Sequence, residues 1–136
     1  MLRLYAPGFP PAWDQLQREY GVRSSVVSFK MNPVATASGL YDERLRSWFL
    51  EAPKHRETWW IYYHEPEDNV EAGQFTASEF QAAWMHVAQL AASVENPRLH
   101  ATVVLMCYTL KPTSGREVAR VRTSGRKRGR LGLGLL

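Results

Sequence analysis

Short apolar segments that favour β-strands alternate along this chain with segments that have helical periodicity. The predicted strands cover residues 2–5, 25–30, 58–63 and 101–110, and the predicted helices cover about residues 10–20, 42–51 and 76–95. The strands are apolar on both faces, so they need packing partners on both, as in parallel sheets with helical crossovers. The alternation therefore predicts an α/β fold with about four parallel strands. Both a barrel and an open doubly wound sheet satisfy it.

Each predicted helix has a start or stop signal. Pro10-Pro11 opens the first helix and Gly21 follows its end, while Asp42 caps the second. Thr76 and Glu79 have the spacing of a capping box at the start of the third helix. An apolar stripe follows this box at helical spacing, made of Phe80, Ala83, Trp84, Val87, Leu90, Ala91 and Val94.

Length and composition exclude several classes of site. The 136 residues, 45% of them hydrophobic, suit one small domain with a real core. The single cysteine, Cys107, allows no intramolecular disulfide or thiolate metal site, and its apolar neighbours predict a packed core residue. His55, His86 and His100 lack metal-ligand spacing, and no glycine-rich phosphate loop follows a strand. We therefore expect no metal and no cofactor.

The net charge of +4 is unevenly distributed. Residues 1–115 carry a net charge of −2, and residues 116–136 carry +6. We therefore expect a mildly acidic domain over 1–115 and a basic tail over 116–136, either disordered or translated out of frame. A basic arm that binds nucleic acid is the alternative, but the domain offers no basic face to support a nucleic-acid partner. No apolar stretch reaches membrane-spanning length, and no secretory signal opens the chain.

The third predicted strand ends in a pair of ionisable residues, His64 and Glu65, followed by Pro66. In parallel α/β proteins the chemistry collects at the carboxyl ends of the strands. Strand alternation predicts that Glu65 shares one face with Trp59, Ile61 and Tyr63, and that His64 favours the other face. Apolar rings around a carboxyl group raise its pKa and suit it to general-acid catalysis. A surface glutamate in a turn is the alternative.

Other polar residues flank this strand end. Lys30 and Asn32 end the neighbouring predicted strand and are expected either to hydrogen-bond a ligand or to lie in a solvated loop. His64 is expected to orient other groups rather than to act as a catalytic base. The acidic residues that follow fit no EF-hand spacing, so an exposed acidic loop is predicted for Glu67, Asp68 and Glu71.

A resemblance to a known family rests on two segments. Residues 62–68, Tyr-Tyr-His-Glu-Pro-Glu-Asp, precede a helix entry at Phe75-Thr76-Ala77 and a helix with Phe80, Trp84 and His86. Together they resemble the fourth βα unit of family 26 glycoside hydrolases, which are β-mannanase-like enzymes of the retaining (β/α)8-barrel clan. The resemblance covers about residues 1–115 and implies strands two to five of a TIM-type barrel.

The resemblance also implies a function. Glu65 would be the acid/base residue, and a β-linked polysaccharide or oligosaccharide would be the substrate, contacted by His64, Tyr63, Lys30 and Asn32. The parent family is extracellular. The loop Pro66-Glu67-Asp68-Asn69 departs from the Met-Asn-Gly type of the best-known mannanases.

A retaining glycosidase needs two carboxyl groups about 5–5.5 Å apart. After Ala101 no carboxylate ends a predicted strand, and Glu117 lies in the basic tail. We therefore expect a fragment that lacks the nucleophile, is inactive alone, and self-associates through open sheet edges. A carbohydrate-binding or other interaction remnant without catalysis is the alternative.

Overall fold

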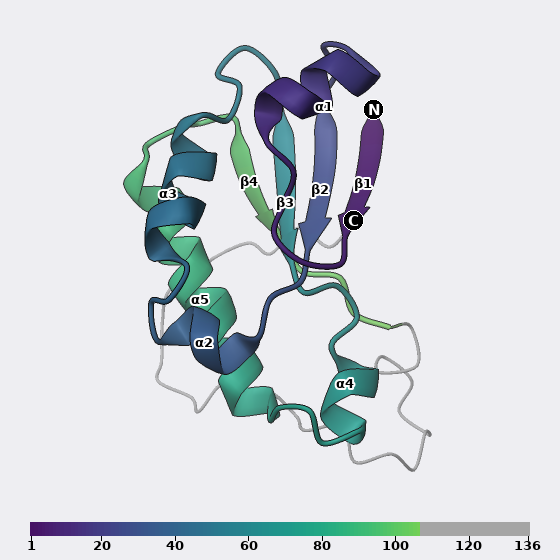
Figure 1. Ribbon diagram of the computed structural model, residues 1–136, viewed down its shortest axis with the longest axis vertical. Coiled ribbons are helices and arrows are strands. Elements are labelled where there is room, and N and C mark those ends of the chain that lie inside the picture. The colour runs from purple at the N-terminus through teal and green to yellow at the C-terminus, as the bar shows by residue number, and fades with distance from the viewer. Residues whose placement is uncertain (107–136) are drawn as a thin grey trace, which may run out of the picture.

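The computed structural model describes residues 1–106, which form one open parallel sheet with helices packed against it (Figure 1). The four strands are β1 (Leu2–Ala6), β2 (Ser25–Phe29), β3 (Thr58–Tyr62) and β4 (Leu99–Thr102). The helices are α1 (Trp13–Tyr20), α2 (Pro33–Ala37), α3 (Asp42–Leu50), α4 (Glu67–Glu71) and α5 (Ala77–Ser93). The predicted α/β class with four parallel strands is confirmed.

The strands lie in the order β1-β2-β3-β4, and every neighbouring pair is parallel. A doubly wound sheet reverses its strand order at a switch point, whereas a (β/α)8 barrel adds its strands consecutively. The described strands show no such reversal, and their consecutive order is one that a barrel also has. All four carboxyl ends lie at one edge, which is the lower edge in Figure 1.

One face of the sheet holds the hydrophobic core. Val27 pairs with Trp60 and Phe29 with Tyr62, and these four side chains are almost fully buried. They form one cluster with residues from three helices, namely Trp13 and Leu16 of α1, Leu45, Trp48 and Phe49 of α3, and Ala83, Val87 and Ala91 of α5. Within residues 1–106 the helices of this core therefore lie mainly on one face of the sheet.

The opposite face carries a row of residues at a single level. Tyr5 pairs with Ser28, Ser28 with Ile61, and Ile61 with Thr102. Strand alternation turns these side chains away from the core helices, toward what is the interior of a closed barrel. Trp59 lies on this face as well, next to the ring of His100 at 5.3 Å.

Among the described helices, side-chain caps are present at the starts of α2 and α5. The predicted cap Asp42 is instead the first helical residue of α3, which has no side-chain cap. At α5 both halves of the predicted capping box are present, with the Thr76 hydroxyl accepting from the Glu79 amide and the Glu79 carboxylate accepting from the Thr76 amide. The start of α1 differs from the prediction, because Pro10 and Pro11 precede the helix, which begins at Trp13.

Two short helices occupy segments predicted to be loops. Asn32 caps α2, with Pro33 at its first position. The acidic run after Pro66 forms α4. At the end of the described region, β4 is shorter than the predicted strand over residues 101–110: it spans Leu99–Thr102, and the residues through Met106 follow without strand structure. Cys107 and the basic tail lie outside the described residues.

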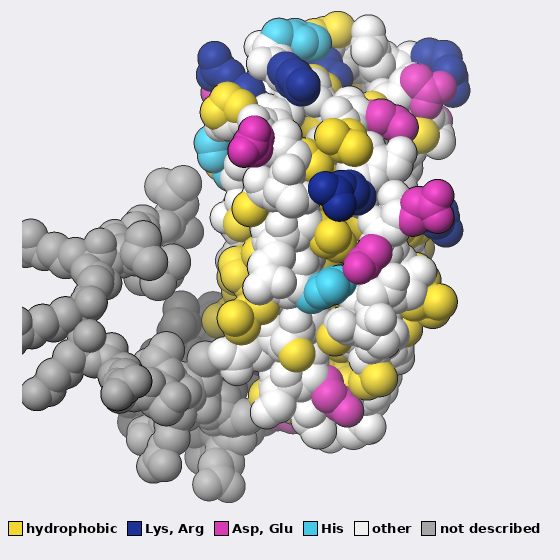
Figure 2. All heavy atoms as spheres, turned by 90° about the vertical axis from the view of Figure 1, so that its left-hand side faces the viewer, with side chains coloured by type: hydrophobic (Ala, Val, Ile, Leu, Met, Phe, Trp, Pro, Cys, Tyr) yellow, Lys and Arg dark blue, Asp and Glu magenta, His cyan; other side chains and the backbone are white. Residues whose placement is uncertain are grey.

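The surface formed by α3 and α5 mixes charged side chains of both signs with apolar ones (Figure 2). Within residues 1–106, every helix falls short of the length and apolar character needed to cross a membrane.

Candidate functional site

The backbone leaves β3 through two left-handed residues. Tyr63 has a φ of 55° and Glu65 a φ of 51°. Among residues 1–106 the only other non-glycine residue with a positive φ is Glu95, at the end of α5. Such conformations cost about 1–2 kcal/mol per residue and cluster at functional sites. The carboxyl end of β3 is therefore the locally strained part of the sheet edge.

The positive φ of Tyr63 breaks the alternation of the strand. Its ring is buried on the core side, where it contacts Phe75 at 4.8 Å and Tyr62 at 6.0 Å. The prediction that Tyr63 shares a face with Trp59 and Ile61 was wrong. Burial raises the pKa of the Tyr63 hydroxyl. The Tyr63 ring is therefore part of the core next to the site and is not exposed for stacking against a ligand.

His64 takes the opposite side from the one predicted. Its Nδ1 atom lies 2.5 Å from the Ser28 hydroxyl, on the face of the sheet that also carries Ile61. The Tyr5 ring meets the imidazole edge-on, with centroids 5.0 Å apart. His64 is therefore held between β1 and β2 on the face that corresponds to a barrel interior.

The surroundings of His64 favour its neutral form. Partial burial is the main cause that lowers its pKa, and the positive charges of Lys30 and Arg3 lower it further. The carboxylate of Glu65 acts in the opposite direction and does not outweigh them. At neutral pH the ring is therefore uncharged and offers one donor nitrogen and one acceptor nitrogen.

Glu65 lies at this strand end with its side chain exposed. Its backbone N–H donates to the Val104 carbonyl at 2.9 Å, which ties the β3 end to the chain that follows β4. The predicted enclosure of its carboxyl group by aromatic rings was wrong, because the turn at Tyr63 moves the nearest ring into the core. The exposed position agrees with the alternative, a surface glutamate in a turn. The carboxylate is free to meet a ligand from solvent.

Glu67 differs most from the predicted exposed acidic loop. It begins α4, only 9% of its surface is exposed, and its Oε1 accepts from the Met106 amide at 3.0 Å. Its Oε2 is buried and has no hydrogen-bond partner among the described residues. Asp68 and Glu71 are exposed, as predicted.

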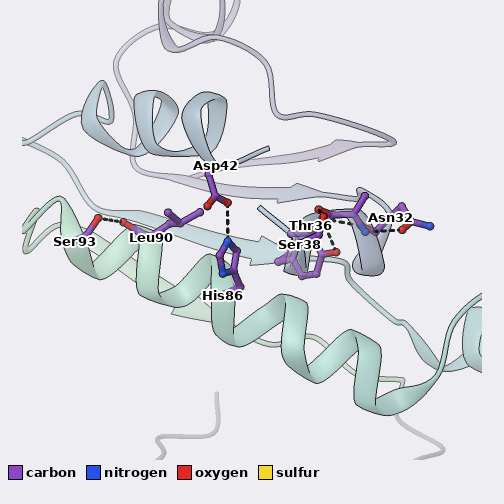
Figure 3. A network of polar contacts seen from close by, with 9 residues as sticks. Asn32, Thr36, Ser38, Asp42, His86, Leu90 and Ser93 are labelled. Carbon is purple, nitrogen blue, oxygen red and sulfur yellow. Dashed lines mark hydrogen bonds and ion pairs between the residues drawn. The ribbon is translucent and has the colours of Figure 1, made fainter. Parts of the chain in front are cut away.

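Lys30 and Asn32 have structural contacts at the end of β2. The Lys30 ammonium lies 5.0 Å from the centre of the Tyr63 ring, a cation–π contact. The Asn32 side chain accepts from the Ala35 amide and so caps α2 (Figure 3). Lys30 is thus close enough for its charge to act on His64. The side-chain oxygen of Asn32 is instead occupied by its hydrogen bond to the Ala35 amide.

Other histidines form separate polar contacts. His86 of α5 points at Asp42 of α3, 2.6 Å away (Figure 3), and His100 contacts the Glu57 carboxylate, which also pairs with Arg98. No group of three or more His, Cys, Asp or Glu side chains within residues 1–106 has an arrangement that fits a metal ion.

Ser28 and Tyr5 also belong to this site, although neither was predicted from the sequence to do so. Ser28 is a polar residue inside an apolar strand, which is a local signal, but its partner lies 36 residues away. Tyr5 is the last residue but one of β1 and is 55% exposed, so the aromatic surface open to solvent at this edge comes from β1 instead of from Tyr63.

Comparison of the chain with protein-family models, with curated proteins and with solved structures gives no match.

Proposed function

We propose that this chain carries the acid/base part of a retaining glycoside hydrolase that acts on a β-linked polysaccharide, with Glu65 as the acid/base residue. The observation that carries the proposal is the position of Glu65: an exposed carboxylate in a left-handed backbone conformation at the carboxyl end of a parallel strand. This is the edge at which barrel enzymes place catalytic groups. Neutral His64 and the exposed ring of Tyr5 beside it suit a polyhydroxylated ligand.

The proposed chemistry has two steps. The Glu65 carboxylic acid gives its proton to the glycosidic oxygen as the bond from this oxygen to the anomeric carbon breaks, and a second carboxylate forms a glycosyl ester. The Glu65 carboxylate then takes a proton from the water that attacks the anomeric carbon and releases the second carboxylate. Within residues 1–106, no carboxylate follows directly on β1, β2 or β4, so the nucleophile of this mechanism comes from outside the described residues.

Carbohydrate binding without hydrolysis is the second candidate. It is favoured because, within residues 1–106, no carboxylate that could serve as the nucleophile follows directly on β1, β2 or β4. Both candidates predict that the full chain binds a β-linked oligosaccharide at Tyr5, His64 and Glu65.

The test uses manno-, gluco- and xylo-oligosaccharides. Binding to the full chain is followed by amide chemical shifts, with changes expected around His64 and Glu65. Hydrolysis is measured in a longer polypeptide that supplies the further strands. There Glu65→Gln should reduce turnover of unactivated substrates at least about 100-fold, the usual contribution of general acid catalysis. Azide should restore turnover of aryl glycosides that have good leaving groups.

Glu95→Gln is the matched control, because Glu95 is also exposed and has the same φ of 51°. It should leave binding and turnover unchanged. Wild-type turnover in Glu65→Gln would overturn the catalytic proposal, and absence of oligosaccharide binding by the full chain would overturn both candidates.

A further inference from the structure

The side chains of Ser28 and His64 form a hydrogen-bonded pair that connects β2, inside the sheet, to the segment that follows the carboxyl end of β3. Their hydrogen bond, at 2.5 Å, links β2 to the residue after Tyr63. Ser28 is 1% exposed, while His64 is half-buried. A group as buried as Ser28 does not reach a substrate, so whatever it contributes passes through the imidazole.

We propose that Ser28 is a positioning residue that holds His64 as the Nε2-protonated tautomer and directs this N–H toward the ligand. The role of this tautomer in sugar binding rests on the proposed function above. The tautomer itself is a property of the fold.

Hydrogen-bond accounting assigns the proton. Among residues 1–106, the Ser28 hydroxyl has one side-chain or backbone partner, His64 Nδ1. A buried hydroxyl hydrogen needs an acceptor, so Ser28 donates and Nδ1 accepts. A neutral imidazole that accepts at Nδ1 carries its hydrogen on Nε2. The lowered pKa of His64 keeps the ring neutral and therefore keeps Nδ1 available as an acceptor at neutral pH.

The packing around the ring restrains its orientation. Tyr5 meets the imidazole edge-on at 5.0 Å, and the register that pairs Tyr5 with Ser28 places both on one face of the sheet. With Nδ1 bonded to Ser28, the donor at Nε2 is left for an oxygen atom of the ligand. A sugar hydroxyl or ring oxygen accepts such a bond. His64 in this state is a hydrogen-bond donor and not a general base.

The experiment is nitrogen–proton NMR of the histidine rings in the full 136-residue chain at neutral pH. His64→Gln identifies the His64 signals, and His55, His86 and His100 are internal references. Wild-type His64 should show the Nε2-protonated pattern. Ser28→Ala should lower the ratio of Nε2-protonated to Nδ1-protonated rings by about five- to tenfold, the effect of losing one ordinary hydrogen bond. Ser28→Thr, which keeps the hydroxyl, should restore it.

Ser25→Ala is the matched control: Ser25 is a buried serine of the same strand, and its hydroxyl donates to the Arg23 carbonyl. It should leave the His64 tautomer unchanged. A Nδ1-protonated His64 in the wild-type chain overturns the proposal without any variant, and so does an unchanged tautomer ratio in Ser28→Ala.

Oligosaccharide titration separates this proposal from the proposed function. The Kd of Ser28→Ala should rise by the factor by which the competent tautomer falls. Equal Kd values in Ser28→Ala and the wild type overturn the positioning role while the proposed function stands. A wild-type chain that has the expected tautomer and binds no oligosaccharide supports the positioning of His64 and contradicts the proposed function.

Discussion

Replacing Tyr62 by phenylalanine tests how the end of β3 is fixed to the loop that follows β2. The Tyr62 side chain is 1% exposed, and its hydroxyl donates to the Met31 carbonyl at 2.8 Å. Thr36 Oγ1 lies 3.3 Å from the same hydroxyl. Burial is the main cause that raises the Tyr62 pKa, so the hydroxyl remains a donor throughout the working pH range.

The magnitude follows from what phenylalanine keeps and what it loses. The ring contacts with Phe29 and Phe80 stay, so the transfer of apolar surface is unchanged. The bonds of the hydroxyl to the Met31 carbonyl and, at longer distance, to Thr36 Oγ1 are lost, and the carbonyl of buried Met31 keeps no other backbone or side-chain donor among the described residues. Leaving such a group unpaired costs about 1–3 kcal/mol. We expect the free energy of unfolding to fall by about 2 kcal/mol.

Urea unfolding followed by tryptophan fluorescence measures this change. With a slope of about 2 kcal/mol per molar, the midpoint should fall by about 1 M. Tyr5→Phe is the control, because the ring of Tyr5 is exposed and its hydroxyl has no hydrogen bond to a described residue. It should stay within about 0.5 kcal/mol of the wild type. If both variants unfold at the same urea concentration, the Tyr62–Met31 bond does not fix the strand end.

Four further predictions concern the same edge and the sheet around it. Asn32→Ala removes the α2 cap and should lower stability by about 1 kcal/mol in urea unfolding, whereas Asn32→Asp should retain it. Glu65→Gly and Glu95→Gly should each raise stability in urea unfolding by about 0.5–1 kcal/mol, because glycine relieves the strain of a positive φ. Folding lowers the pKa of His64, so the unfolded chain binds a proton at His64 first as the pH falls. The free energy of unfolding should therefore decline from about pH 6.5 down to the folded pKa of His64 and level off below it. Urea titrations at several pH values measure this decline, which His64→Gln should remove. Strands β1 and β4 are the edge strands of the described sheet, and such edges tend to pair with another chain. The full chain should therefore self-associate in size-exclusion chromatography. A monomer that melts cooperatively would contradict this expectation.

Local patterns in the sequence predicted the main elements. Apolar runs located β1, β2 and β3 within a residue or two, and the Thr76–Glu79 capping box fixed the start of α5. Consecutive strand order was not determined by these patterns, which suited a barrel and a doubly wound sheet equally. Helix α2 was predictable in principle, because Asn32-Pro33 is a cap followed by proline at the first helical position.

The errors at the site have nonlocal or backbone causes. The period of two held through Tyr62 and failed at Tyr63, where the positive φ exchanged the faces of Tyr63 and His64. Nothing in the strand pattern signals this turn. Burial of Glu67 depends on the Met106 amide, 39 residues later, and the Ser28–His64 bond spans 36 residues. Such contacts follow from the packing of the whole sheet and not from the neighbourhood of either residue.

The two left-handed residues at the end of β3 have different physical explanations. At Tyr63 the strained backbone places a large ring in the core against Phe75 and under the Lys30 ammonium, and this burial offsets its cost. Glu65 gains no comparable packing, because its side chain is exposed and its conformation adds one backbone bond, to Val104. Glu95 has the same φ and is also exposed, but it follows the end of a helix, whereas Glu65 follows the end of a parallel strand, the edge at which barrel enzymes place catalytic groups. The position of the Glu65 carboxylate is therefore the feature of this edge that most requires a functional explanation.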